Sequence, residues 1–166
     1  MTTLGAPAAL HLNPGEIAFA GEGQRVTTLL GSCVALTVWH PQSAQGGMCH
    51  AMLPVRARAS ALAPGCYVDE AVDLLLRAAA RRVPVMRMEY KLFGGGCLFG
   101  DEGPDGDSIG ERNVKRLREL LAARGVKPVA EHCGGRGWRT LVFDLSDGRV
   151  RLRHNVPGAQ CMEWMV

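Results

Sequence analysis

The stretch TTLLGSCVALTVWHPQSAQGGMCHAMLP (27–54) contains two short apolar segments separated by a polar one. LGSCVALTVW (30–39) predicts a buried strand, because its branched and apolar residues alternate along the chain. HPQSAQGG (40–47) predicts a loop, and MCHAML (48–53) predicts a second strand that ends at Pro54. The stretch therefore predicts two neighbouring antiparallel strands.

Two helices follow this stretch. YVDEAVDLLLRAAARR (67–82) predicts a helix with one apolar stripe. SIGERNVKRLRELLAARG (108–125) predicts another, in which Ser108 and Glu111 form a capping box and Gly125 ends the helix. The remaining predicted strands are short ones within 15–28, then 85–93, 127–133, and a hairpin of 138–145 with 149–153.

The order of these elements is strands, helix, strand, helix, strands. It favours an α+β protein with a mixed β-sheet sandwich and flanking helices over a doubly wound parallel sheet. Residues 1–14 have no period and predict a loose N-terminal lead-in, and residues 15–166 predict a single domain.

Composition narrows the class of protein. The chain has 166 residues, 47% hydrophobic and 21% charged, with a formal charge of +3. No basic run is interleaved with aromatic residues, so no nucleic-acid surface is predicted. No apolar stretch approaches the roughly 18 residues of a membrane span, and no secretory signal is evident. The six cysteines form no CxxC, which disfavours a redox protein and predicts reduced thiols in the cytoplasm.

Cys33 is the best candidate for a cysteine nucleophile. Such a residue needs a base, usually a histidine, and backbone N–H donors near the carbonyl that it attacks. Cys33 follows Gly31 and Ser32, where the missing side chain of Gly31 lets a substrate approach the backbone, and His50 lies on the next predicted strand. Spacing alone leaves open that Cys33 is a core residue and His50 a structural histidine.

Other cysteines make weaker candidates. Cys97 follows three glycines and could present a thiol, although a buried small residue after a tight turn is the simpler interpretation. Cys133 adjoins His132, but neighbours on a strand point to opposite faces. No cysteine or histidine set has the spacing of a zinc site, so no metal is predicted.

The 27–54 stretch resembles the CheD family of chemoreceptor glutamine deamidases. The resemblance rests on a Thr six residues before Gly-Ser-Cys and on the motif Gly-Met-x-His-x-Met-Leu-Pro. In this chain the matching segments are Thr27, Gly31-Ser32-Cys33, GMCHAMLP (47–54), FGGGCLF (93–99), IGERNV (109–114) and Gly134-Gly135.

The resemblance implies that Cys33 is the nucleophile, His50 the general base and Thr27 the residue that orients His50. Backbone N–H groups around Ser32 and Cys33 would hold the oxyanion. It also implies a fold like that of deamidating-toxin catalytic domains, a cytoplasmic location and a receptor glutamine as substrate. The phosphatase CheC is an implied partner. No cofactor is expected, and a monomer is the default expectation.

Several alternatives remain open from the sequence alone. Thr28 adjoins Thr27, and only one of the two can face the site. His40 stands where the family is expected to have Asp and adds a second histidine near the site. The competing functions are a non-catalytic binding module of the chemotaxis system and a thiol hydrolase of small amides or esters. An activated thiolate predicts that Cys33 is alkylated before the other five cysteines.

Overall fold

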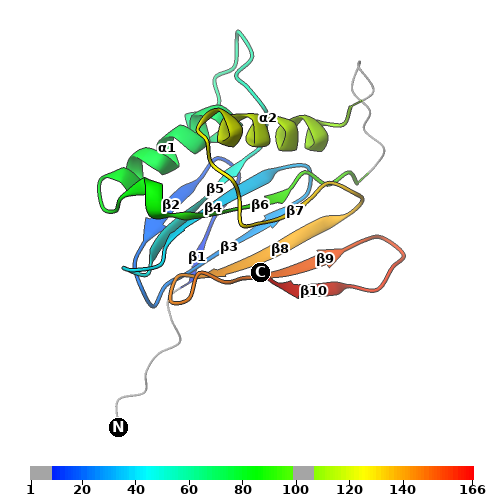
Figure 1. Ribbon diagram of the computed structural model, residues 1–166. Helices are drawn as coiled ribbons and strands as arrows, with labels where there is room; N and C mark the ends of the chain where they lie inside the picture. The colour runs from blue at the N-terminus through cyan, green and yellow to red at the C-terminus, as the bar shows by residue number, and fades with distance from the viewer. Residues whose placement is uncertain (1–8, 99–106) are drawn as a thin grey trace.

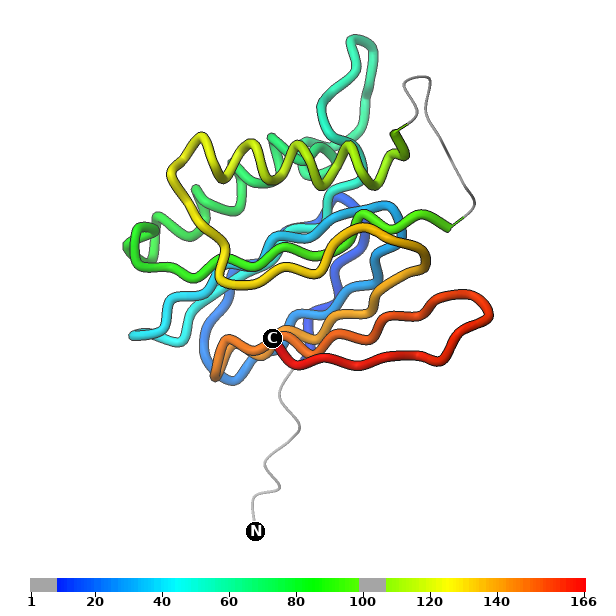
Figure 2. The backbone as a smooth tube through the Cα atoms, turned by 45° about the vertical axis from the view of Figure 1, so that its right-hand side comes forward, coloured from blue at the N-terminus to red at the C-terminus, as the bar shows by residue number. Residues whose placement is uncertain are grey.

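The computed structural model describes residues 9–98 and 107–166 and has three layers (Figure 1). Two helices cover one face of a five-stranded sheet, called the central sheet. The opposite face of the central sheet packs on a second five-stranded sheet, called the outer sheet (Figure 2). Both sheets contain parallel and antiparallel pairs, so the prediction of an α+β protein with mixed sheets is confirmed.

Each sheet combines strands that lie far apart in the sequence. In spatial order, the outer sheet consists of β1 (Ala9–His11), β3 (Arg25–Leu30), β8 (Trp138–Asp144), β9 (Val150–Asn155) and β10 (Met162–Met165). The central sheet consists of β2 (Ile17–Ala20), β5 (Gln45–Ala51), β4 (Val34–His40), β6 (Glu89–Gly94) and β7 (Ala130–Cys133). The helices are α1 (Val68–Ala80) and α2 (Ile109–Ala123), with short 3₁₀ turns at Pro64–Cys66 and Val85–Arg87.

Two hydrophobic cores separate the layers. In β4, Val34, Leu36 and Val38 contact the helices, as their alternation predicts. Ala35 and Trp39 point the other way and belong to the core between the two sheets. The central sheet is therefore buried on both faces.

The predicted helices form close to their expected bounds. Ser108 and Glu111 form the predicted capping box, which satisfies N–H groups at the start of α2. Gly125 follows α2 with a φ of +67°, a conformation that glycine adopts at low cost after a helix. No helix in the described ranges is long and apolar enough to cross a membrane.

The predicted single strand over 30–39 is wrong. The structure has two strands there, β3 ending at Leu30 and β4 beginning at Val34, and they belong to different sheets. Residues 31–33 cross from the outer sheet to the central sheet. The predicted pairing of the two strands around residues 40–47 is confirmed, because β4 and β5 are antiparallel neighbours.

The expectation of a loose lead-in over residues 1–14 is wrong for its second half. Residues 9–11 form β1, which pairs in parallel with β3. Leu12 is buried in the core between the sheets, and its N–H donates to the Thr27 carbonyl at 2.8 Å. Residues 1–8 lie outside the described residues. At the other end of the chain, β10 also adds an edge strand that the sequence does not predict.

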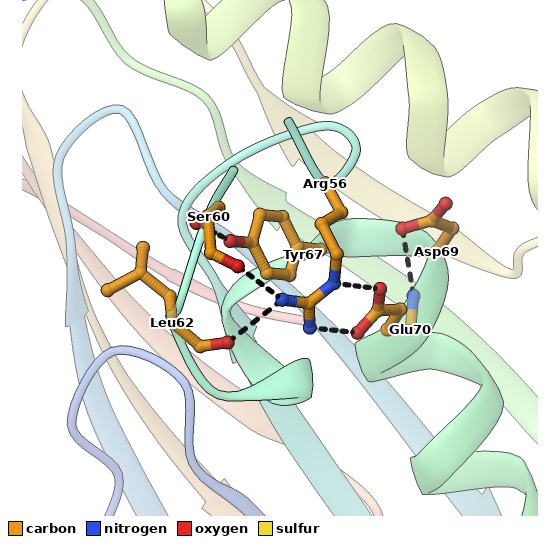
Figure 3. A network of polar contacts seen from close by, with 6 residues as sticks. All are labelled: Arg56, Ser60, Leu62, Tyr67, Asp69 and Glu70. Atoms are coloured by element: carbon orange, nitrogen blue, oxygen red, sulfur yellow. Dashed lines mark hydrogen bonds and ion pairs between the residues drawn. The ribbon is translucent and has the colours of Figure 1, made fainter. Parts of the chain in front are cut away.

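The predicted surface loop over 55–66 is organised around Arg56 (Figure 3). Its guanidinium donates two hydrogen bonds to the Glu70 carboxylate at 2.8 and 2.7 Å, and lies 4.3 Å from the centre of the Tyr67 ring. It also donates to the carbonyls of Ser60 and Leu62. These contacts tie the loop to the start of α1.

Candidate active site

Cys33 lies at the crossover between the sheets, directly before β4. Its side chain is half-buried and packs against the core between the sheets. Ala35, two residues further on, points to the same side. The thiol therefore lies at the rim of the intersheet core.

The backbone of residues 31–33 is held at every carbonyl group. The carbonyls of Gly31, Ser32 and Cys33 accept hydrogen bonds from Gly96 N–H at 2.9 Å, Asn113 Nδ2 at 3.0 Å and Gly95 N–H at 2.8 Å, respectively. In the part of the chain that the structure describes, the N–H groups of Ser32 and Cys33 donate to no other residue. A rigid segment with free N–H groups is the arrangement that binds an oxyanion.

The glycine-rich segment after β6 explains how this backbone is held. Gly94 has a φ of +106°, and a Cβ atom there would lie 2.2 Å from the Cys33 carbonyl oxygen. Only glycine permits this close approach. The FGGGC motif thus supports the backbone of Cys33 from one side.

His50 is on β5 and faces the core between the sheets. It is opposite Ala35 in the antiparallel β4–β5 pair, and a continuation of this register by one residue beyond Val34 would make Cys33 its diagonal neighbour. Diagonal neighbours in such a pair have Cβ atoms about 7 Å apart, which long side chains can span. Cys33, which packs against the core between the sheets, and the buried His50 therefore lie on the same side of the central sheet.

The hydroxyl that contacts His50 belongs to Thr28, so the expectation that Thr27 makes this contact is wrong. Thr28 Oγ1 lies 2.7 Å from His50 Nδ1. Thr27 is on the opposite face of β3, where its hydroxyl lies 3.0 Å from His11 Nδ1. The alternation of Val26, Thr28 and Leu30, all buried, is the signal that distinguishes the two threonines.

The hydrogen bonds of Thr28 determine the tautomer of His50. The hydroxyl has one proton, and it donates that proton to the Leu12 carbonyl oxygen at 2.8 Å. Thr28 Oγ1 must then accept from His50 Nδ1–H, which leaves Nε2 as the basic nitrogen. Nε2 is buried and has no hydrogen-bond partner among the described residues, so its lone pair is free.

We expect Thr28→Val to reduce kcat about fivefold, because loss of a hydrogen bond worth about 1 kcal/mol lets His50 change tautomer. Thr28→Ser keeps the hydroxyl and should keep most of the activity. Thr27→Val is the matched control on the exposed face and should leave kcat unchanged. Steady-state turnover rates of the three folded variants make the comparison. A loss confined to Thr27→Val would return the orienting role to that residue.

Burial favours the neutral forms of the His50 imidazole and the Cys33 thiol. It lowers the pKa of His50 to about 4, although the Leu12 carbonyl acts in the opposite direction. Burial also raises the pKa of the Cys33 thiol to about 11. The backbone N–H of Cys33 acts against this rise, whereas Cys66 adds to it. The resting pair is a thiol and a neutral imidazole, which differs from the activated thiolate expected from the sequence. Attack by Cys33 would therefore need a base that removes the thiol proton.

These pKa values predict a flat pH profile near neutrality. His50 is a base only when it is neutral, so kcat/KM should fall on acidification only as the pH approaches about 4. Alkylation of Cys33 by iodoacetamide should keep rising with pH up to the thiol pKa of about 11. Rates measured across the range in which the protein stays folded test both statements. Half-maximal kcat/KM near pH 6.5, or alkylation that is constant from neutral pH upward, would contradict them.

The other candidate residues lie elsewhere. His40 is at the opposite end of β4 from Cys33, about 23 Å away at the rise of a strand, so the expectation of a second histidine near the site is wrong. Its Nδ1 lies 2.8 Å from Ser43 Oγ, a contact within the β4–β5 turn. His132 accepts a hydrogen bond from Arg139, whereas Cys133 packs toward the helices.

Cys97 is half-buried and lies close to the crossover. It helps to line a small hollow with Ser32, Leu98 and the first residues of α2. In the described ranges, no group of three or more potential ligands could hold a metal ion.

Comparison with known proteins identifies the family. The profile of the family described as "CheD chemotactic sensory transduction" matches residues 52–154. A protein of Dechloromonas aromatica named "Probable chemoreceptor glutamine deamidase CheD 3" is 46% identical over 153 residues, which cover 89% of each chain.

Two further relatives have the name "Probable chemoreceptor glutamine deamidase CheD". The protein from Pseudomonas syringae pv. syringae is 41% identical over 93% of this chain and 89% of its own. The protein from Pyrococcus abyssi is 43% identical over 86% of this chain and 88% of its own. Because the similarity spans nearly the whole length on both sides, this chain belongs to the CheD family.

Proposed function

We propose that this chain is a protein-glutamine deamidase that converts glutamine side chains of chemoreceptors to glutamate. The observation that carries the proposal is the buried Nε2 of His50, which has no hydrogen-bond partner among the described residues, together with the packing of Cys33 against the core between the sheets, which His50 also faces. The names of the relatives supply the substrate, because they describe chemoreceptor glutamine deamidases.

In the proposed reaction, Cys33 Sγ attacks the side-chain carbonyl carbon of the glutamine as its proton passes to His50 Nε2. The N–H groups of Ser32 and Cys33, which donate to no other residue in the described part of the chain, hold the oxyanion, and Gly31 adds no side chain to this backbone. His50 then returns the proton to the leaving nitrogen, and ammonia departs from a glutamyl thioester. Water that gives a proton to His50 hydrolyses the thioester, which yields glutamate and restores the Cys33 thiol.

Thr28 takes the orienting role in this proposal, since its hydroxyl contacts His50. Other parts of the proposal rest on the family resemblance alone. They are action in the cytoplasm, binding to the phosphatase CheC, and likeness of the fold to deamidating-toxin catalytic domains. A monomer is the default expectation and does not follow from the resemblance.

The proposed substrate is tested by incubating the full-length protein with a chemoreceptor cytoplasmic fragment and, separately, with free glutamine and small amides. Peptide mass mapping should show Gln-to-Glu conversion at specific receptor positions, with little ammonia released from the small amides. Faster turnover of small amides would instead assign the chain to small-molecule hydrolases. An unmodified receptor fragment together with no turnover of small amides would favour a binding module.

A further inference from the structure

Asn113 occupies a position where a helix of this kind normally has an apolar residue. It is the fifth residue of α2 and lies on the buried stripe with Gly110, Val114 and Leu117. Its side chain is fully buried. Asparagine is a poor helix former, and a buried amide is costly unless it is hydrogen-bonded. A specific contact must therefore explain its presence.

The side-chain amide of Asn113 joins the two segments of the candidate site. Nδ2 donates to the Ser32 carbonyl at 3.0 Å and to the Met52 carbonyl at 2.9 Å. Ser32 precedes Cys33, and Met52 is two residues after His50 on the extension of β5. The two acceptors also determine which way the amide points, because a flipped amide would place its oxygen against two carbonyl oxygens. Oδ1 consequently has no partner in the described part of the chain.

The contact with Ser32 sets the direction of the Cys33 N–H. In a trans peptide, the carbonyl of one residue and the N–H of the next point in opposite directions. Because Asn113 holds the Ser32 carbonyl toward α2, the Cys33 N–H is directed away from the helix.

Helix α2 is well placed to hold this amide firmly. Its first turn is closed by the capping box of Ser108 and Glu111. Gly110 packs against the glycine-rich segment, where an added Cβ would lie 2.5 Å from the Gly95 carbonyl oxygen. The helix, the glycine-rich segment and the crossover thus form one packed unit around residues 31–33.

We propose that Asn113 is a positioning residue of the reaction, which holds the Ser32–Cys33 peptide so that the Cys33 N–H donates to the oxyanion. This inference rests on the proposed function, in which Cys33 attacks a carbonyl. Asn113 touches neither the substrate nor the reacting atoms. Its removal should slow steps that form an oxyanion and leave unaffected those that do not.

The test compares Asn113→Asp with wild type in two reactions at Cys33. In acylation by p-nitrophenyl acetate, sulfur bonds to the acetyl carbon, p-nitrophenolate leaves, and an oxyanion forms on the way. In alkylation by iodoacetamide, sulfur displaces iodide and no oxyanion forms. Aspartate has the same shape as asparagine but places oxygen against both carbonyls. Acylation and receptor kcat should fall about 100-fold, with alkylation and KM nearly unchanged.

Two further variants separate positioning from stability. Asn113→Ala removes the amide without adding charge and serves if the aspartate variant does not fold. Leu117→Ala, one turn along the same buried stripe, should lower the melting temperature yet leave the ratio of acylation to alkylation at the wild-type value. An unchanged ratio in the folded Asn113 variants would overturn the inference. Because the ratio needs no receptor, failure of wild type to modify receptors would count against the proposed function alone.

Discussion

Cys33→Ala is expected to abolish Gln-to-Glu conversion, with a loss of at least roughly 1000-fold in kcat. Without the thiol no thioester can form, and the half-buried site should accept the smaller side chain without unfolding. Peptide mass mapping of a receptor fragment measures the conversion, and circular dichroism establishes that the variant is folded.

Cys97→Ala is the matched control for this variant. Cys97 is also half-buried and lines a small hollow together with Ser32, so it is a second thiol close to the crossover. The control should convert the receptor at the wild-type rate. If Cys33→Ala stayed active and Cys97→Ala did not, the nucleophile would be the cysteine of the glycine-rich segment.

His50→Gln should reduce kcat by roughly 100- to 10,000-fold, the usual contribution of a general acid and base. Glutamine can still contact Thr28, so the packing between the sheets should survive, but it cannot accept the thiol proton at neutral pH. Because burial raises the pKa of Cys33 to about 11, very little thiolate forms without a base. The residual rate of the variant should therefore rise with pH as hydroxide takes over the deprotonation.

The control for His50→Gln is His40→Gln, since His40 is buried at the far end of β4. The two variants are directly comparable because His40 lies on β4 and His50 on its neighbour β5, both in the central sheet. His40→Gln should keep the wild-type kcat. Full activity of a folded His50→Gln variant would require another base and would remove the main support for the proposed reaction.

Local sequence patterns predicted much of this fold. The capping box of Ser108 and Glu111 specified the start of α2, because both partners lie within one turn of the chain. The alternation in β4 indicated the correct buried face, and the polar segment between two apolar ones indicated the β4–β5 pair. These features depend on neighbours in sequence.

Features that depend on distant partners were not predictable in this way. The chain is apolar on both sides of residues 31–33, so nothing local shows that β3 and β4 join different sheets. The three residues of β1 are exposed and have no clear pattern of apolar residues. They form a strand because they pair with β3, which is distant in the sequence. The Asn113 contacts join residues 81 and 61 positions apart, beyond the reach of any local pattern.

The candidate site contains features that the sequence predicts and one that it predicts wrongly. The residue types, a glycine before the thiol and the expectation of adjacent strands predict Cys33 and His50, and both residues lie toward the core between the sheets. The choice of Thr27 followed a motif spacing instead of strand alternation. The buried positions of Val26 and Leu30 select Thr28, because side chains of one face recur at every second residue.

The central claim, a thioester on Cys33, is tested most directly by adding hydroxylamine during turnover of a receptor fragment. Hydroxylamine attacks a thioester in competition with water, which converts the target glutamine to a hydroxamate and frees the thiol. Mass mapping should show hydroxamate at the deamidated positions, increasing with hydroxylamine concentration for wild type and absent for Cys33→Ala. Formation of glutamate alone, at every hydroxylamine concentration, would mean that water attacks the amide directly and would contradict the account.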